Sequence, residues 1–170
     1  MKCRIIFSVL LVFAITACAY PVERDSTGVI GVWQIKDLAS KDGSGRMDSK
    51  PIPSLFIFTP HHYSMVWVGG TELQRTFAER WSPTDAEKIE RYNSLVVNSG
   101  TYEIEDSTIT VCPIVARVPE FMGGTLVFEY RVEDDILWLT MVNEYSYDGV
   151  QAPWVADNAG LILTLMRINQ

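Results

Sequence analysis

The sequence predicts an all-β domain made of antiparallel hairpins. From about residue 29 onward, short runs that alternate apolar and polar residues recur, and turns rich in Gly, Pro, Asn and Asp separate them. Such runs at regular spacing are typical of a sandwich or a barrel. A single stretch has the three- and four-residue apolar spacing of a helix. We therefore expect one domain over residues 29–170, with about eight strands and one mid-chain helix.

The first part of this domain predicts three strands. The first covers about residues 30–38 and leads into a loop rich in Gly, Ser, Lys and Asp. The second and third cover residues 55–59 and 63–68. Pro60-His61-His62 joins them, so they form a tight hairpin, and Gly69-Gly70 ends the second arm.

The helix is predicted to begin at Ser82-Pro83. Ser82 would be the N-cap and Pro83 the first helical residue, with Thr84 as an alternative cap. The helix would end near residues 98–100, and we expect it to cover one opening of the barrel. Its apolar stripe consists of Ile89, Tyr92 and Val96.

After Gly100 the alternation typical of strands returns. Turns at Glu105-Asp106-Ser107 and Asp134-Asp135 each join two of these runs. The loop from Gly149 to Gly160 precedes the last strand. The predicted strands are 101–105, 108–112, 125–132, 136–143 and 161–168.

The two ends of the domain carry a recognisable pair of residues. Gly31-x-Trp33 opens the first strand, and Arg167 lies in the last one. This pair resembles the lipocalin and calycin barrels. The resemblance implies that the Trp33 ring closes the floor of a barrel and that the Arg167 guanidinium stacks on it in a cation–π contact.

The order of further motifs is similar to that of the bacterial lipocalin-like domain family. This resemblance covers roughly residues 29–143 and implies a closed antiparallel barrel, in a family whose members mostly have no assigned activity. An open sandwich is the alternative. The chain departs from secreted lipocalins in the mid-chain position of its helix and in lacking their second and third signature motifs. The motifs that carry the resemblance are Gly31-x-Trp33, Leu55-x-x-Phe58-Thr59-Pro60, Tyr63-Ser64-Met65, Gly100-Thr101-Tyr102-Glu103, Gly123-Gly124-Thr125 and Leu137-x-Leu139-Thr140.

The first residues of the chain predict export. Lys2 and Arg4 precede an apolar run from Ile5 to Ile15, and small residues follow. Residues 1–19 therefore predict a secretory signal peptide, which is too short for a membrane span of about 20 apolar residues. Residues 20–28 would be a tether.

Two cleavage sites are open. Ala17-Cys18-Ala19 fits ordinary signal cleavage, which would free Tyr20 and give a soluble secreted or periplasmic protein. Ile15-Thr16-Ala17-Cys18 resembles the bacterial lipobox, in which Cys18 becomes the lipidated first residue of an envelope lipoprotein. A lipid on Cys18 is the only membrane contact that we expect.

Charge and cysteine content exclude other partners and frameworks. The formal net charge is −7, and an acidic surface repels the phosphates of nucleic acids, so we expect no nucleic-acid partner. Once the leader is removed or lipidated, Cys112 has no partner for an intramolecular disulfide. We expect it to be a small buried hydrophobe.

The motifs of the chain indicate no enzyme class. The sequence lacks a Gly-x-Ser-x-Gly elbow, a His-Glu-x-x-His motif, a phosphate loop and paired-Cys zinc spacing. His61-His62 is the single histidine cluster. Neighbours on a strand point to opposite faces, so this pair predicts no metal site, and we expect no cofactor.

The interior of the barrel is the candidate binding site. A barrel of about eight strands either fills its interior with side chains or holds one small ligand. Aromatic and Met-rich strand faces are the ones that a ligand cavity would use. The candidate lining residues are Tyr63, Met65 and Trp67 on one strand, Phe128 and Tyr130 on another, and Trp138, which shares a face with Thr140.

Arg117 lies in an otherwise apolar stretch and has two interpretations. Pointing into the barrel, it would hold the carboxylate of a fatty-acid-like ligand. The alternative is a solvent-facing side chain.

These features together predict an exported binding module for a small apolar or amphipathic molecule. The alternative is an envelope-anchored interaction or structural barrel with a filled core and no ligand. An exposed aromatic patch would favour that alternative, and Tyr145, Tyr147 and Trp154 are its candidates. A polar pocket that holds a carboxyl of shifted pKa, or the Cys112 thiol, would favour an enzyme.

Overall fold

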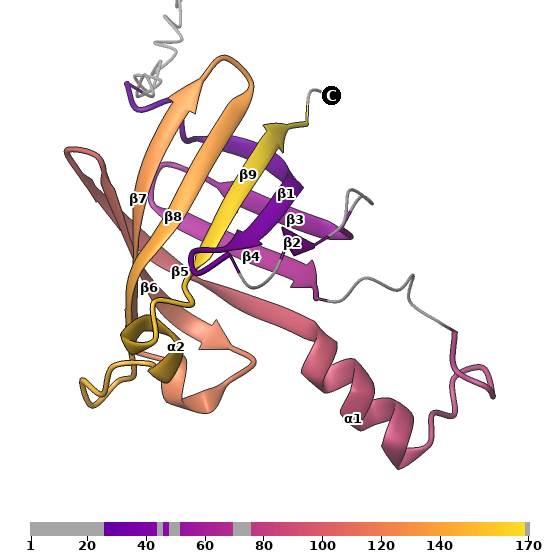
Figure 1. Ribbon diagram of the computed structural model, residues 1–170. Coiled ribbons are helices and arrows are strands. Elements are labelled where there is room, and N and C mark those ends of the chain that lie inside the picture. The colour runs from indigo at the N-terminus through magenta and orange to yellow at the C-terminus, as the bar shows by residue number, and fades with distance from the viewer. Residues whose placement is uncertain (1–25, 44–45, 48–51, 70–75, 169–170) are drawn as a thin grey trace, which may run out of the picture.

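The computed structural model describes residues 26–43, 46–47, 52–69 and 76–168. One nine-stranded antiparallel sheet contains all strands in the order β2-β1-β3-β4-β5-β6-β7-β8-β9, and β1 also pairs with β9. That last pairing closes the sheet into a barrel (Figure 1), to which β2 is a short addition. The strands are β1 (Gly31–Ser40), β2 (Arg46–Met47), β3 (Ser54–Phe58), β4 (His62–Val68), β5 (Leu95–Glu105), β6 (Thr108–Ala116), β7 (Thr125–Glu133), β8 (Ile136–Tyr145) and β9 (Leu161–Arg167).

The all-β prediction and the closed barrel are confirmed, and the open sandwich is excluded. From β3 to β9, each strand pairs with the next one along the chain, as expected for hairpins, and β3 also pairs with β1. The chain closes because β1 and β9 pair from Trp33↔Arg167 to Ser40↔Leu161. The two ends of the domain therefore lie side by side.

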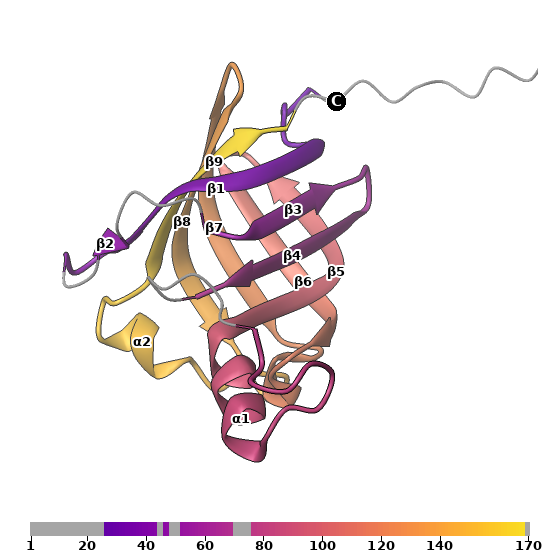
Figure 2. The same ribbon diagram turned by 90° about the vertical axis from the view of Figure 1, so that its right-hand side faces the viewer.

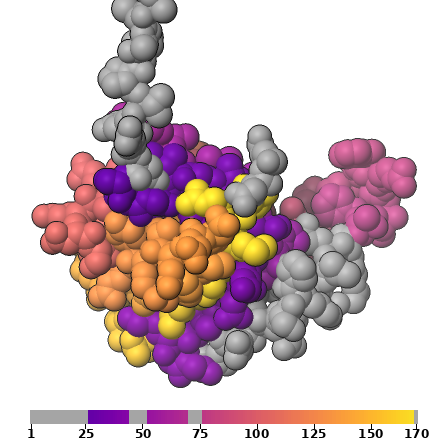
Figure 3. Space-filling model, turned by 90° about the horizontal axis from the view of Figure 1, so that it is seen from above, coloured from indigo at the N-terminus to yellow at the C-terminus, as the bar shows by residue number. Residues whose placement is uncertain are grey.

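The two ends of the barrel are built differently. The closed end contains Trp33 and the tight turns between β3 and β4, β5 and β6, and β7 and β8. Seen end-on in Figure 3, the orange β7–β8 turn, the indigo start of the described chain and yellow β9 lie against one another. The open end contains the longer connections, with α1 (Asp85–Ser94), the short 3₁₀ helix η1 (Pro119–Phe121) and α2 (Pro153–Ala156) (Figure 2).

The core fills the barrel from the closed end. Side chains alternate between the inside and the outside of each strand, as in β8, where Leu137, Leu139 and Met141 are buried. Gly100 lies beside a β-bulge in β5, and a Cβ there would collide with the carbonyl oxygen of Cys112. The largest fully buried side chains are Trp33, Phe56, Phe58, Phe128, Met65, Ile109, Leu137, Leu139, Leu163 and Leu165.

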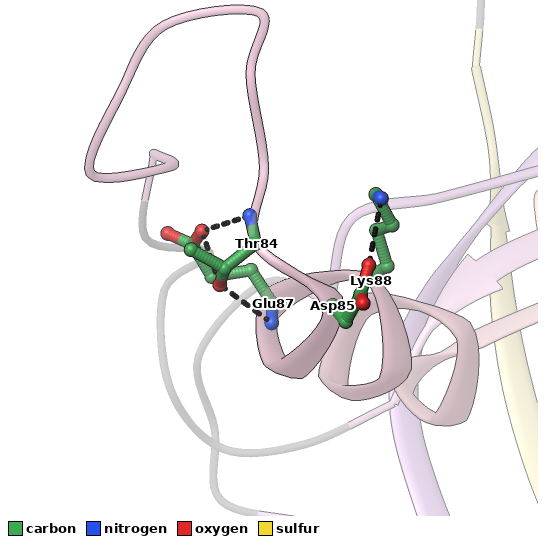
Figure 4. A network of polar contacts seen from close by, with 4 residues as sticks. All are labelled: Thr84, Asp85, Glu87 and Lys88. Atoms are coloured by element: carbon green, nitrogen blue, oxygen red, sulfur yellow. Dashed lines mark hydrogen bonds and ion pairs between the residues drawn. The ribbon is translucent and has the colours of Figure 1, made fainter.

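The N-cap of helix α1 lies two residues later than the first predicted cap, Ser82. The N-cap is Thr84, whose Oγ1 accepts from the backbone N–H of Glu87 at 3.3 Å, and Glu87 Oε2 accepts from the backbone N–H of Thr84 at 2.7 Å (Figure 4). This reciprocal capping box makes the alternative cap the correct one. Backbone N–H groups of Ala78 and Thr84 also lower the pKa of Glu87.

The predicted end of the helix and its predicted place over the barrel opening are wrong. The helix stops at Ser94, and Leu95 already pairs with Val68 in the sheet, so Val96 belongs to β5. The expected apolar stripe thereby loses a member. None of the residues of α1, all of which the structure describes, is buried, and Ile89 and Tyr92 are 61% and 51% exposed. The helix projects from the open end instead of covering it (Figures 1 and 2).

The predicted leader and tether fall largely outside the part of the chain that the structure describes. The residues outside it include Cys18. Among the helices that the structure describes, none combines the length and apolarity needed to cross a membrane.

Candidate functional site in the open half of the barrel

The closed end is held by the predicted Trp33–Arg167 contact. Trp33 is fully buried, and its indole Nε1 donates to the backbone oxygen of Val29 at 2.9 Å. The Arg167 guanidinium carbon lies 4.0 Å from the centroid of the Trp33 ring. The guanidinium also donates to the backbone oxygens of Ile30 and Gly28, at 2.9 and 2.7 Å. One side chain thus joins the last strand to the start of the first.

Gly31 has a steric reason to precede this tryptophan. Its φ is +151°, and a Cβ at this position would collide with the Arg167 guanidinium. A side chain would therefore displace the cation from the ring. The Gly-x-Trp spacing and the distant arginine form one structural unit that closes the floor of the barrel.

Three of the predicted lining residues lie in the filled half. Tyr63, Met65 and Phe128 point inward and are at most 3% exposed. They pack with Phe56 and Phe58, which pair across the strands with Met65 and Tyr63. The Tyr63 hydroxyl has no hydrogen-bond partner in the part of the chain that the structure describes, and burial raises its pKa well above the usual value. These residues therefore belong to the core and do not border the cavity described below.

Tyr130 and Trp138, two further strand candidates, differ in their orientation. Tyr130 is half-buried and packs against the same core as Phe128. Trp138 lies on the outer face, because the buried residues beside it in β8 are Leu137 and Leu139. The Arg131 guanidinium carbon lies 3.9 Å from the centroid of the Trp138 ring. The prediction that Trp138 lines the interior is therefore wrong, and its ring is covered by a surface arginine instead.

A cavity of about 360 Å³ occupies the open half of the barrel. It lies next to the filled core on the side of the open end, at the ends of β4, β6 and β8 and the starts of β5, β7 and β9. Its volume falls within the range of ligand pockets, about 300–1,000 Å³. Trp67 and Arg117 are the predicted site residues that border it. Its apolar lining includes Trp67, Val96, Ala116, Phe121, Leu126, Met141 and Leu161.

Asn98 is a polar residue at the inner end of this cavity. It pairs with Met65 on β4 and with Ala116 on β6, so it occupies the rung between the filled core and the cavity. The residue is 4% exposed, and its Oδ1 has no hydrogen-bond partner among the described residues. An unpaired buried acceptor costs about 1–3 kcal/mol.

Glu144 lies nearer the mouth, opposite Leu126 on the neighbouring strand. Its Oε2 accepts from the indole Nε1 of Trp154 at 2.8 Å. Burial raises the pKa of the Glu144 carboxyl, and the Trp154 hydrogen bond opposes that shift. Trp154 belongs to α2 and is 47% exposed, so this pair joins the mouth of the cavity to the surface.

Arg117 lies at the rim and is half-buried. Its guanidinium carbon is 4.8 Å from the centroid of the Tyr92 ring, and Nη1 donates to the backbone oxygen of Tyr92. The Tyr92 hydroxyl in turn donates to the backbone oxygen of Arg117 at 3.2 Å. Arg117 therefore fixes the last turn of α1 to the barrel and does not point into the middle of the interior.

The cavity is suited to binding and carries little catalytic machinery. The described residues that line it include no Ser, Cys, His, Lys, Tyr or Asp side chain, and Glu144 is their single carboxyl group. The Cys112 thiol does not border the cavity, and burial, followed by the charge of Glu103, raises its pKa. Of the two features that would favour an enzyme, only the shifted carboxyl is present, within an apolar pocket.

Most of this lining was not predicted from the sequence. Asn98 and Val96 were assigned to the helix, although Leu95-Val96-Val97 carries two consecutive β-branched residues, which favour a strand. A strand beginning at Leu95 places Val96 and Asn98 on one face. That alternation was a usable signal for both residues.

The sequence model of the lipocalin-like domain family matches residues 30–160. The match covers most of the chain and runs from the strand that opens the barrel to the loop before the last one. The chain belongs to the lipocalin-like domain family. The predicted resemblance is thereby confirmed, together with the barrel that it implies.

Other comparisons add little to this lipocalin-like domain. A search of curated proteins finds no match. Among solved structures, an uncharacterized protein from Bacteroides eggerthii is similar, with 12% sequence identity and a TM-score of 0.43. The alignment covers 82% of this chain and 98% of that one.

Proposed function

We propose that this lipocalin-like domain is an exported binding module for a small apolar or amphipathic molecule held in the open half of its barrel. The observation that carries the proposal is the apolar cavity of about 360 Å³ between the filled core and the open end. At about 30 Å³ per molecule of liquid water, this space suits a ligand of roughly a dozen non-hydrogen atoms.

The available binding energy supports a ligand of this size. Burying about 200–300 Å² of apolar surface at about 25 cal/mol per Å² contributes roughly 5–7 kcal/mol, before the costs of association. This contribution alone corresponds to dissociation constants between about 0.2 mM and about 10 μM, so affinities in the high-micromolar range are expected. Trp67 lines the cavity, so a bound molecule should change the tryptophan fluorescence.

A cavity-filling variant tests the proposal. Ala116 borders the cavity, and Ala116→Phe should fill part of it and weaken binding of an apolar probe such as para-butylphenol by about tenfold or more. Calorimetric titration measures the affinity. Binding that is unchanged in Ala116→Phe would refute the assignment of the ligand to this cavity.

Val115→Phe is the matched control. Val115 is 54% exposed and lies next to Ala116 in β6, on the outer face. The same side chain is added one position away, outside the barrel. This variant should bind the probe as the unchanged protein does.

An interaction or structural barrel is the second candidate, and exposed apolar side chains favour it. Trp81 is 90% exposed, Ile114 is 68% exposed and Tyr147 is 67% exposed. The filled closed half also agrees with a rigid support. Failure of every apolar probe to bind would make this candidate the better one.

Export and the lipid on Cys18 are part of the proposal and rest on the sequence alone. The basic and apolar start of the chain supports a signal peptide, and Ile15-Thr16-Ala17-Cys18 supports lipidation. Mass spectrometry of the mature N-terminal peptide tests both. A lipidated Cys18 is expected, and a free N-terminus at Tyr20 would leave a secreted or periplasmic soluble protein.

A further inference from the structure

The polar groups around the cavity differ in charge and in depth. Asn98 lies at the inner end, is 4% exposed and has an amide oxygen without a partner among the described residues. Glu144 and Arg117 lie near the mouth, and both already have partners. The inner group is therefore neutral and open to a ligand, whereas the charged groups are engaged.

We propose that Asn98 selects ligands that carry a neutral hydroxyl group, which enters first and hydrogen-bonds the Asn98 amide at the inner end of the cavity. This inference rests on the binding function proposed above and specifies the class of ligand. The apolar body of such an alcohol or phenol would lie against Trp67, Val96 and Leu126.

The chemistry of the amide accounts for the choice of a hydroxyl. The free Oδ1 requires a donor, and a hydroxyl group is a donor that can also accept from the amide nitrogen. A hydroxyl therefore fits both orientations of the amide. A hydrocarbon would leave the buried oxygen unpaired.

A carboxylate is disfavoured for two reasons. It has no hydrogen to donate to Oδ1, and in either orientation of the amide Asn98 carries no charge to offset the burial of an anion. To reach Asn98 it would also pass Glu144, which lies nearer the mouth. The Arg117 guanidinium would attract a carboxylate only at the rim, where it is held by the ring and the backbone oxygen of Tyr92.

The experiment compares two ligands of one shape with a slightly larger carboxylate. Para-butylphenol and para-butyltoluene have the same number of non-hydrogen atoms and differ in a hydroxyl against a methyl group, and para-butylbenzoate supplies the carboxylate. Calorimetric titration of the full protein gives their affinities. We expect the phenol to bind about tenfold more tightly than the toluene, and the benzoate to bind most weakly.

Asn98→Leu provides the decisive comparison, because leucine has nearly the size of asparagine and no polar atoms. The variant should keep its affinity for the toluene while the preference for the phenol falls about tenfold. Retained binding of the toluene shows that the variant is folded and that the cavity is intact.

The outcomes separate this inference from the binding function. If phenol and toluene bind equally well in the unchanged protein, or if Asn98→Leu leaves their ratio unaltered, a bound water satisfies Asn98 and the inference is overturned while the binding function stands. Tightest binding of the benzoate would overturn it in favour of Arg117 as the anchor. If none of the three binds, the proposed function itself fails.

Discussion

The closed and open halves of this barrel use the same strands for opposite purposes. Between the rung of Met65 and Asn98 and the closed end, large buried side chains fill the interior, and the Trp33–Arg167 pair closes the floor. Toward the open end, the strands carry Val96, Ala116 and Leu126 and leave a cavity of about 360 Å³. The large buried side chains are concentrated in one half, and the other half is hollow.

The connections between strands follow the same division. Short turns at the closed end hold neighbouring strands in register, as at Asp106 and Asp134, where φ is near +52° in both cases. The open end has the helical connections, whose side chains include Trp154 at the mouth of the cavity. The groups that line the cavity thus lie on the connections and strand ends, next to a packed core.

The largest expected effect comes from removing the floor of the barrel. Trp33→Ala should lower the free energy of unfolding by about 3–5 kcal/mol, because it leaves a large void in a fully buried site. Trp154→Ala, at the half-exposed mouth, should lower it by about 1 kcal/mol or less. Urea denaturation of both variants measures the difference. Equal losses would show that the two halves do not differ in their share of stability.

Two arginine–tryptophan pairs at nearly the same distance sharpen the comparison. The Arg167–Trp33 and Arg131–Trp138 distances are 4.0 and 3.9 Å, but the Arg167 side chain is 23% exposed and the Arg131 side chain is 64% exposed. Arg167→Leu also removes the donor to two backbone oxygens, so it should cost about 1–3 kcal/mol.

Arg131→Leu is the control for that variant. An exposed cation–π contact contributes about 0.5–1 kcal/mol, so the loss should not exceed this range. Denaturant titrations of the two variants give both values. A loss in Arg131→Leu as large as that in Arg167→Leu would mean that ring stacking alone, without burial or backbone hydrogen bonds, sets the contribution.

The closed half was largely predictable from the sequence. Its strands alternate clearly, its turns contain Pro60 or paired acidic residues, and Gly31-x-Trp33 has a steric cause that leaves a mark in the sequence. Trp138 was misplaced because both faces of β8 carry large apolar residues. In such a strand the period of two does not tell which face is inside, and the aromatic one lies outside.

The open half was less predictable, because its features depend on tertiary contacts. The helical spacing of Ile89, Tyr92 and Val96 continued past Ser94, but pairing with β4 takes over at Leu95. Tertiary pairing thus outweighs local periodicity. A cavity is also invisible in an apolar pattern, since its walls and a packed core use the same residues.

The smallest expected effect concerns pH and Glu144. Its pKa is raised in the folded protein, so the protonated carboxyl stabilises the fold below its ordinary pKa of 4.5, and that contribution is lost as the pH rises through the raised pKa. Glu144→Gln keeps an acceptor for Trp154 and removes the titration. The free energy of unfolding of this variant, relative to that of the unchanged protein, should therefore be higher at pH 8 than at pH 3.5. Urea denaturation at the two pH values measures it. Glu87→Gln is the control with the opposite sign, because backbone N–H groups lower the pKa of Glu87. Its free energy of unfolding, relative to that of the unchanged protein, should be lower at pH 8 than at pH 3.5. Parallel pH dependence in the two variants would contradict the difference in environment between the mouth of the cavity and the exposed helix.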